Sequence, residues 1–227
     1  MANVRRSLTK GLIAASVIAA AGVGLTPATA SADITPTTVV NGVEVAVTPT
    51  EAWGTPWCKM VHFERDAEAL VKARGERTDP TVLIVAPMSG HYATLLRDTV
   101  SAFIGEHEVY VTDWSDARMV PVIAGRFDLN DYIDHVMGML RALGPDTHVV
   151  AVCQPGPLVL AAVSLMAQED DPCAPATMTI MGSPIDARKS PTAPNKLAET
   201  RDLDWFKQNM IHTVPALYPG AFRRVYP

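Results

Sequence analysis

The sequence predicts an α/β fold, in which a mostly parallel sheet carries helices on both faces. Between residues 81 and 181, short apolar runs typical of strands alternate with longer segments that have helical periodicity. The apolar runs are continuous, as expected for strands that are buried on both faces. The composition, 48% hydrophobic and 19% charged, is that of a globular protein.

The first part of the chain is expected to stand apart from this fold. Residues 1–32 are laid out like a secretory signal peptide, with a basic start at Arg5-Arg6, an apolar run and then small residues. An uncleaved membrane anchor is the alternative, although the apolar run is short for a span. Residues 33–56 are interpreted as a linker or edge hairpin, because Asn41-Gly42 is typical of a tight turn between strands.

Residues 57–227 are expected to form a partial α/β core. Strands are predicted at residues 57–63, 81–86, 108–112, 147–152 and 177–181. Helices are predicted within residues 64–79, 92–104, 129–143, 157–168 and 204–210. The helix over 129–143 is the best defined, because its apolar residues share one face, Asp128 can cap its start and Gly144-Pro145 can end it.

Charge and cysteine content restrict the partners. The formal net charge is -5 and the Lys and Arg residues are scattered, so nothing predicts binding to nucleic acid or anionic lipid. The three cysteines cannot all pair within one chain, so at least one thiol stays free or pairs outside it. Whether Cys58 and Cys173 pair, and whether the protein is oligomeric, stays open.

The stretch around Cys153 predicts a nucleophile elbow. An apolar strand ends at Val152, Cys153 follows, and an apolar helix begins within a few residues. A nucleophile on such a turn lies at the carboxyl end of the sheet, above a helix N-terminus that favours negative charge. The backbone N–H of Gln154 would then point toward an oxyanion. Pro155 stands where the usual elbow has glycine, and a buried structural cysteine is the alternative interpretation.

A second oxyanion donor is expected after the strand at residues 81–86. Hydrolases with an elbow place this donor in the loop after an earlier strand, which here contains Met88 and Ser89. His91 lies in the same loop and is a candidate for positioning substrate. An ordinary polar turn is the alternative interpretation of this loop.

Four segments in this order resemble the intracellular polyhydroxyalkanoate (polyhydroxybutyrate) depolymerases of the α/β-hydrolase superfamily. The resemblance runs from about residue 57 to residue 227. The segments are Ala86-Pro87-Met88-Ser89-Gly90-His91-Tyr92, Thr112-Asp113-Trp114-Ser115-Asp116-Ala117-Arg118, Val152-Cys153-Gln154-Pro155 and Met181-Gly182-Ser183-Pro184-Ile185-Asp186.

The resemblance implies an α/β-hydrolase fold and hydrolysis of ester bonds in poly(3-hydroxyalkanoate) through a cysteine nucleophile, without a metal or organic cofactor. The partner implied is the polyester polymer or granule surface. The Asp and His of the family's triad lie in a later portion than this chain covers, so the core is expected to be truncated at the C-terminus and the chain alone to be at best feebly active. The family implies a cytoplasmic, granule-associated protein, whereas residues 1–32 predict a secreted or periplasmic one.

Two other functions stay open. Polyhydroxyalkanoate synthases also carry an elbow cysteine on this fold, so acyl transfer is one alternative, although their elbow usually reads Gly-x-Cys-x-Gly, unlike Val152-Cys153-Gln154-Pro155. A non-catalytic polymer-binding fragment is the other. Binding to polyester that survives Cys153→Ala, without ester turnover, would favour it.

Overall fold

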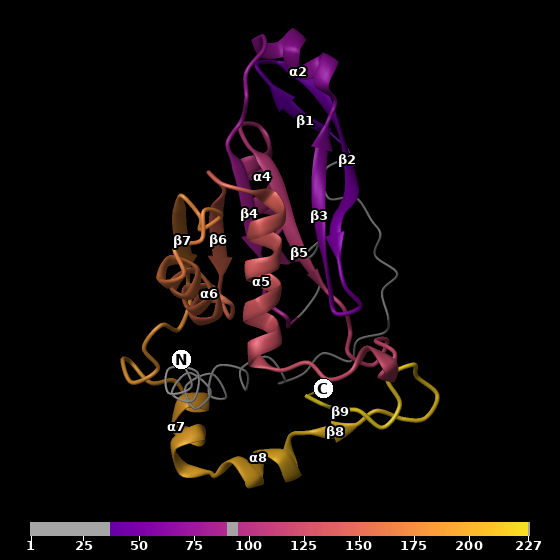
Figure 1. Cartoon of the computed structure of the whole chain (residues 1–227), viewed down its shortest axis with the longest axis vertical. Helices are drawn as coiled ribbons and strands as arrows, with labels where there is room; N and C mark the ends of the chain where they lie inside the picture. Colours follow the sequence, from indigo (N-terminus) through magenta and orange to yellow (C-terminus); the bar gives the residue numbers. More distant parts are fainter. Residues whose placement is uncertain (1–36, 90–94, 227) are drawn as a thin grey trace.

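The computed structural model describes residues 37–89 and 95–226, and a seven-stranded mixed sheet forms the centre of this part of the chain (Figure 1). Its strand order is β1-β2-β3-β5-β4-β6-β7. The strands are β1 (Thr37–Val40), β2 (Val43–Gly54), β3 (Cys58–Arg65), β4 (Thr81–Val85), β5 (Glu108–Trp114), β6 (His148–Val152) and β7 (Thr177–Met181). A separate antiparallel pair consists of β8 (His212–Thr213) and β9 (Arg224–Val225).

The sheet combines an antiparallel and a parallel part. Strands β1, β2, β3 and β5 pair antiparallel in that order, whereas β5, β4, β6 and β7 are mutually parallel neighbours. The predicted hairpin is confirmed, because β1 pairs with β2 across Asn41 and Gly42, which have φ values of 47° and 80°. Positive φ at both positions is what a type I′ hairpin turn requires.

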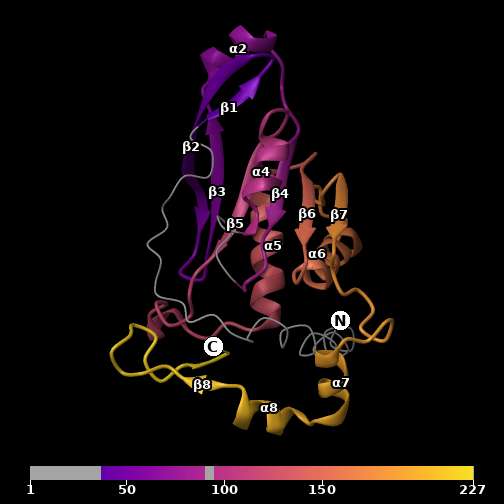
Figure 2. The same ribbon diagram turned by 180° about the vertical axis from the view of Figure 1, so that it is seen from behind.

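Helices cover both faces of the sheet, as the sequence predicts. The helices of the described residues are α2 (Ala67–Arg74), α4 (Arg97–Ile104), α5 (Leu129–Leu143), α6 (Gly156–Gln168), α7 (Ala193–Thr200) and α8 (Leu203–Asn209), with a short 3-10 helix η2 (Val122–Ala124). Helices α5 and α6 pack on a face that includes Leu83 and Val85, and α4 packs on the face that includes Val82 and Ile84. The two views in Figures 1 and 2 show these layers from opposite sides.

The amphipathic helix predicted at residues 129–143 is confirmed as α5. Asp128 accepts hydrogen bonds from the N–H groups of Asn130 and Asp131, and the Asp131 carboxylate accepts one from the Asp128 N–H. This capping box satisfies donors that a helix start otherwise leaves unpaired. The buried residues of α5 are Tyr132, Ile133, Val136, Met137, Met139 and Leu140.

Some predicted bounds differ from the structure. The helix expected over residues 92–104 is α4, which begins at Arg97, and residues 90–94 lie outside the described part of the chain. The signal-like segment at residues 1–32 also lies outside it. No helix among the described residues has the length and apolar character needed to cross a membrane.

The C-terminal segment was predicted only in part. The sequence predicts one helix there, at residues 204–210, whereas the structure has α7, α8 and the β8–β9 pair. This segment runs beneath the carboxyl ends of β4, β6 and β7 in both side views (Figures 1 and 2). It is tied to the loop after β5, since Gly220 N–H donates to Arg118 O at 2.9 Å and Val122 N–H donates to Pro219 O at 3.2 Å.

Candidate active site

Cys153 lies on the sharp turn between β6 and α6. Its φ is 65°, a left-handed conformation that costs a non-glycine residue energy and persists only where surrounding contacts impose it. Two backbone hydrogen bonds do so: Cys153 N–H donates to Met181 O at 2.7 Å, and Gly156 N–H donates to Cys153 O at 3.3 Å. The side chain is exposed. The chain therefore presents a strained, accessible thiol at the end of a central parallel strand, as the elbow interpretation expects.

Gly156 explains how the turn tolerates Pro155 in the usual glycine position. A Cβ added to Gly156 would lie 2.3 Å from both Cβ and Oγ of Ser183, in the loop after β7. The close approach that the elbow needs is therefore displaced by one residue, from the position of Pro155 to that of Gly156. Pro155 itself is the N-cap of α6, and Pro157 lies in the first turn, where its missing N–H costs little.

The loop after β4 is fixed by the end of β5. The N–H of Ala86 donates to Thr112 Oγ1 at 2.8 Å, and the indole Nε1 of Trp114 donates to Ala86 O at 3.0 Å. Trp114 is held in turn by stacking on Tyr132 of α5, with ring centroids 4.3 Å apart. The Thr112 and Trp114 side chains thus hydrogen-bond both the N–H and the C=O of Ala86.

One hydrogen bond joins this loop to the elbow. The N–H of Met88 donates to Gln154 Oε1 at 3.0 Å, across 66 residues of sequence. The structure thereby brings Met88 against Gln154, the residue that follows Cys153, and Ser89 follows Met88 in the loop; the sequence predicts these four as nucleophile and oxyanion-hole residues. His91, the candidate for positioning substrate, lies outside the described residues.

The three cysteines differ in environment, and all are free. Cys58 is buried in the core and its Sγ donates to Lys59 O at 3.4 Å. Burial raises the pKa of the Cys58 thiol far above its usual value, and the nearby Asp113 carboxylate adds to this. Cys173 is half-buried after α6, so Cys153 is the most accessible thiol of the three.

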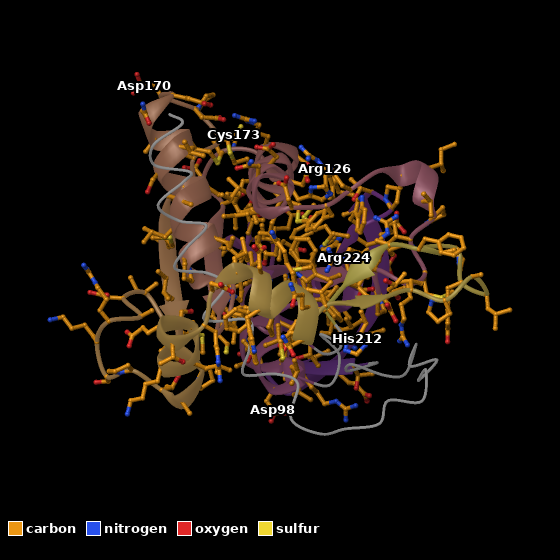
Figure 3. The ribbon with its side chains drawn as sticks, turned by 90° about the horizontal axis from the view of Figure 1, so that it is seen from below. Asp98, Arg126, Asp170, Cys173, His212 and Arg224 are labelled. Atoms are coloured by element: carbon orange, nitrogen blue, oxygen red, sulfur yellow. The ribbon has the colours of Figure 1, made fainter. Side chains whose placement is uncertain are left out.

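Four of the histidines hold partners away from Cys153. His62 pairs with Glu108 at 2.9 Å, His107 with Phe103 O at 3.1 Å, His135 with Thr55 Oγ1 at 2.8 Å, and His148 with Thr177 Oγ1 at 2.7 Å. His212 lies on β8, opposite Val225 of β9, at the end of the molecule viewed in Figure 3. No side chain of residues 37–89 or 95–226 hydrogen-bonds the Cys153 thiol.

The described part of the chain contains no cluster of His, Cys, Asp and Glu residues that could hold a metal ion. A shallow hollow lined by Ala67, Glu68, Val71 and Lys72 lies on α2, at the far end of the molecule from the elbow (Figure 1). The elbow and the loop after β4 are therefore the candidate site.

A parallel sheet covered by helices, with a nucleophile elbow at the carboxyl end of a central strand, is the arrangement of the α/β-hydrolases. Residues 182–227 match the family model described as the PHB de-polymerase C-terminus. The matched segment includes α7, α8 and the β8–β9 pair, together with Ser183 against the elbow. The chain thus resembles the polyhydroxybutyrate depolymerases, as its motifs predict.

Among solved structures, the chain is similar to brefeldin A esterase, described as a bacterial homologue of human hormone-sensitive lipase. The identity is 13% and the TM-score 0.36, over 77% of this chain and 47% of the esterase. The chain thus spans about half the length of that protein. No curated protein matches the sequence.

Proposed function

We propose that this chain carries the nucleophile of an ester hydrolase that acts on poly(3-hydroxyalkanoate). The observation that carries the proposal is the exposed Cys153 on a strained turn between β6 and α6, next to a loop that can supply a second oxyanion donor. The match of residues 182–227 to the depolymerase family supports ester hydrolysis as the reaction and a polyester as the substrate.

The reaction proceeds through a thioester. Deprotonated Sγ of Cys153 attacks the ester carbonyl carbon, and the carbonyl oxygen takes up the electron pair as an oxyanion held by backbone N–H groups. The carbon–oxygen bond to the alcohol then breaks and the alcohol gains a proton. Water attacks the thioester, the carbon–sulfur bond breaks, and the hydroxyacid and the free thiol are released.

The proposal also requires a general base for the thiol and the water. The four partnered histidines of the described residues are engaged at sites away from Cys153. Loss of triad members elsewhere lowers turnover by up to about a millionfold and leaves weak catalysis from the oxyanion hole. We therefore expect low turnover from residues 1–227 alone.

The test is to trap the acyl-enzyme. The chain is incubated with a short activated ester of 3-hydroxybutyrate, and the labelled residue is located by peptide mass spectrometry. We expect a 3-hydroxybutyryl thioester on Cys153 because acylation needs only the thiol and the oxyanion donors. Cys153→Ala should abolish the label and the ester turnover.

Cys173→Ala is the matched control, because this thiol is partly accessible but lies outside the elbow. Its label and turnover should equal those of the unaltered chain. Turnover that survives Cys153→Ala, or a label on Cys173 in place of Cys153, would overturn the proposal. Polymer formed from a hydroxyacyl-coenzyme A would favour acyl transfer instead.

A second candidate function is binding of polyester without catalysis. It is favoured by the absence, among residues 37–89 and 95–226, of a side chain that hydrogen-bonds the Cys153 thiol. Sedimentation with amorphous polyhydroxybutyrate granules tests it. Equal binding by the unaltered chain and Cys153→Ala, with no acyl label on either, would favour this function over hydrolysis.

A further inference from the structure

The Gln154 side chain has a contact that the proposed mechanism does not use. Its Oε1 accepts the Met88 N–H at 3.0 Å, so the residue after the nucleophile holds the loop after β4 by its side chain. The backbone N–H of the same residue is the first expected oxyanion donor. One residue therefore both belongs to the oxyanion hole and contacts the loop that supplies the other half of it.

The backbone donors of that loop can be assigned in order. The Ala86 N–H is taken by Thr112 Oγ1, Pro87 has no N–H, and the Met88 N–H is taken by Gln154. The Ser89 N–H makes no hydrogen bond within the described residues, and neither does the Gln154 N–H. Within the described residues, the Ser89 and Gln154 N–H groups are thus the backbone donors of the loop and of the elbow turn that remain available to a ligand.

We propose that the Gln154 side chain is a positioning residue that fixes the loop after β4 against the elbow, and that Ser89, not Met88, supplies the second oxyanion donor. The assignment of an oxyanion hole rests on the proposed function, whereas the hydrogen bond that fixes the loop does not. With Ala86 held by Thr112 and Trp114, the Gln154 contact is a second fixed point, two residues further along the loop after β4. Because Ser89 directly follows Met88, the Gln154 contact also restricts where the Ser89 N–H lies relative to the elbow.

A pair of variants isolates the contact. Gln154→Met keeps the length of the side chain and removes the acceptor, whereas Gln154→Glu keeps an acceptor oxygen. Gln168→Met is the matched control, because Gln168 is exposed at the other end of α6 and makes no side-chain hydrogen bond within the described residues. Hydrogen–deuterium exchange of the Met88 amide is measured on the full chain.

We expect the Met88 amide to exchange about fivefold faster in Gln154→Met, the factor that one hydrogen bond of ordinary strength gives. Gln154→Glu and Gln168→Met should keep the original rate. Equal exchange in Gln154→Met and the unaltered chain would overturn the positioning role. This readout requires no catalytic activity.

Kinetics on a soluble 3-hydroxybutyrate ester give the second readout. Because the loop donor acts on the transition state, Gln154→Met should lower kcat roughly tenfold to a hundredfold and change KM by less than about twofold. Gln168→Met should leave both constants unchanged. A rise in KM at constant kcat would mean that Gln154 contacts substrate, and it would overturn the positioning role.

The donor itself is identified with a short trifluoromethyl ketone. The Cys153 thiolate adds to its carbonyl carbon, and the oxygen becomes an anion that mimics the tetrahedral intermediate. We expect the amide proton resonances of Ser89 and Gln154 to move downfield and that of Met88 to stay in place. A shift of Met88 in place of Ser89 would overturn the assignment. Failure to form the adduct would count against the proposed function, and the exchange experiment would still decide the positioning role.

Discussion

Gly156 lacks a side chain at the point where α6 passes closest to the loop after β7. A methyl group there would lie 2.3 Å from Ser183 Cβ and Oγ and 3.1 Å from Ile180 Cγ2. Contacts below 3.0 Å cannot be relieved without moving the loop after β7 or the start of α6, and the start of α6 belongs to the turn that carries Cys153.

We therefore expect Gly156→Ala to destabilise the protein by about 1–3 kcal/mol, the usual cost of overpacking. Urea unfolding followed by circular dichroism measures this change. Gly105→Ala is the matched control, because a Cβ at Gly105 meets nothing within 4 Å and its φ of -67° suits alanine. That variant should be unchanged or more stable by up to about 1 kcal/mol. Equal stability of the two variants would contradict the role assigned to Gly156.

At the scale of single residues, local sequence predicts part of the site. Cys153 could be found because a strand, a nucleophile and a helix follow one another within a few residues. The Gln154 contact with Met88 could not, because its partners lie 66 positions apart and meet only when β4 and β6 pair. The need for glycine at position 156 could not be predicted either, because the close approach to Ser183 arises only when α6 packs against the loop after β7.

Elements are joined at the site by side chains from β5. Thr112 is fully buried, and its Oγ1 accepts the Ala86 N–H at 2.8 Å. Valine has the same shape without the acceptor, so Thr112→Val leaves a buried N–H unpaired, which costs about 1–3 kcal/mol. We expect this loss in urea unfolding, accompanied by faster exchange of the Ala86 amide.

Thr48→Val provides the comparison, since Thr48 lies exposed on β2 and its hydroxyl has no partner within the described residues. Its stability should change by no more than about 0.5 kcal/mol. If Thr112→Val were as stable as Thr48→Val, the loop after β4 would not depend on β5 as inferred.

At the opposite end of the sheet, an ion cluster joins β3, α2 and the start of β4. Arg65 is fully buried and donates to Asp79 at 2.7 Å, and Arg74 and Arg77 bind the same carboxylate. Burial raises the pKa of Asp79, but hydrogen bonds from the three arginines outweigh burial and hold that pKa below its usual value of 3.8.

Since the folded-state pKa of Asp79 is lowered, its contribution to stability is present above about pH 4 and is lost as the pH falls through the lowered value. Asp79→Asn should cost about 3–5 kcal/mol at pH 7, because the buried Arg65 loses one of its two carboxylate partners and keeps only Glu108. The difference from the unaltered protein should shrink at pH 3. Urea unfolding at both pH values measures it, with the exposed Asp170→Asn as control. A stability difference between Asp79→Asn and the unaltered protein that is the same at both pH values would contradict an ionic origin of the Asp79 contribution.

Elements with strong local signals were predicted closely. The bounds of α5 and β7 agree with the sequence prediction because α5 has one apolar face and a capping box, and β7 is a short apolar run after a turn. The β8 and β9 strands have two residues each, too few for any periodicity. They form because Val214 N–H donates to Arg223 O, Phe222 N–H donates to Val214 O, and the Arg223 side chain donates to the loop after β5.

Across the whole molecule, the candidate site and the ion cluster around Asp79 lie at opposite ends of the sheet. The carboxyl ends of the parallel strands carry the strained elbow and the C-terminal segment, whereas the ion cluster and α2 lie at the other end (Figure 1). This separation is typical of parallel sheets, where ligands bind at the carboxyl ends of the strands. Binding or acylation at Cys153 should therefore leave unchanged the pH dependence of the stability that Asp79 contributes.

Under the proposed function, the compartment of the protein decides which polyester it meets, and the first residues of the chain predict that compartment. A basic start at Arg5-Arg6, an apolar run over residues 11–25 and small residues at 30–32 predict export. We expect a fusion of residues 1–40 to alkaline phosphatase, which is active only after export, to be active and cleaved in a bacterial host.

Ile18→Arg in the same fusion is the control, because a charge in the middle of the apolar run opposes insertion at a cost of about 3 kcal/mol. Its phosphatase activity should fall to background. A fusion that is active but uncleaved and is found in the membrane fraction would identify residues 1–32 as a membrane anchor. The rest of the protein would then still lie outside the cytoplasm. An inactive fusion of the unaltered segment would indicate that the protein stays in the cytoplasm. The proposed substrate would then be intracellular polyester granules. The Cys153 thiol would stay reduced in that compartment.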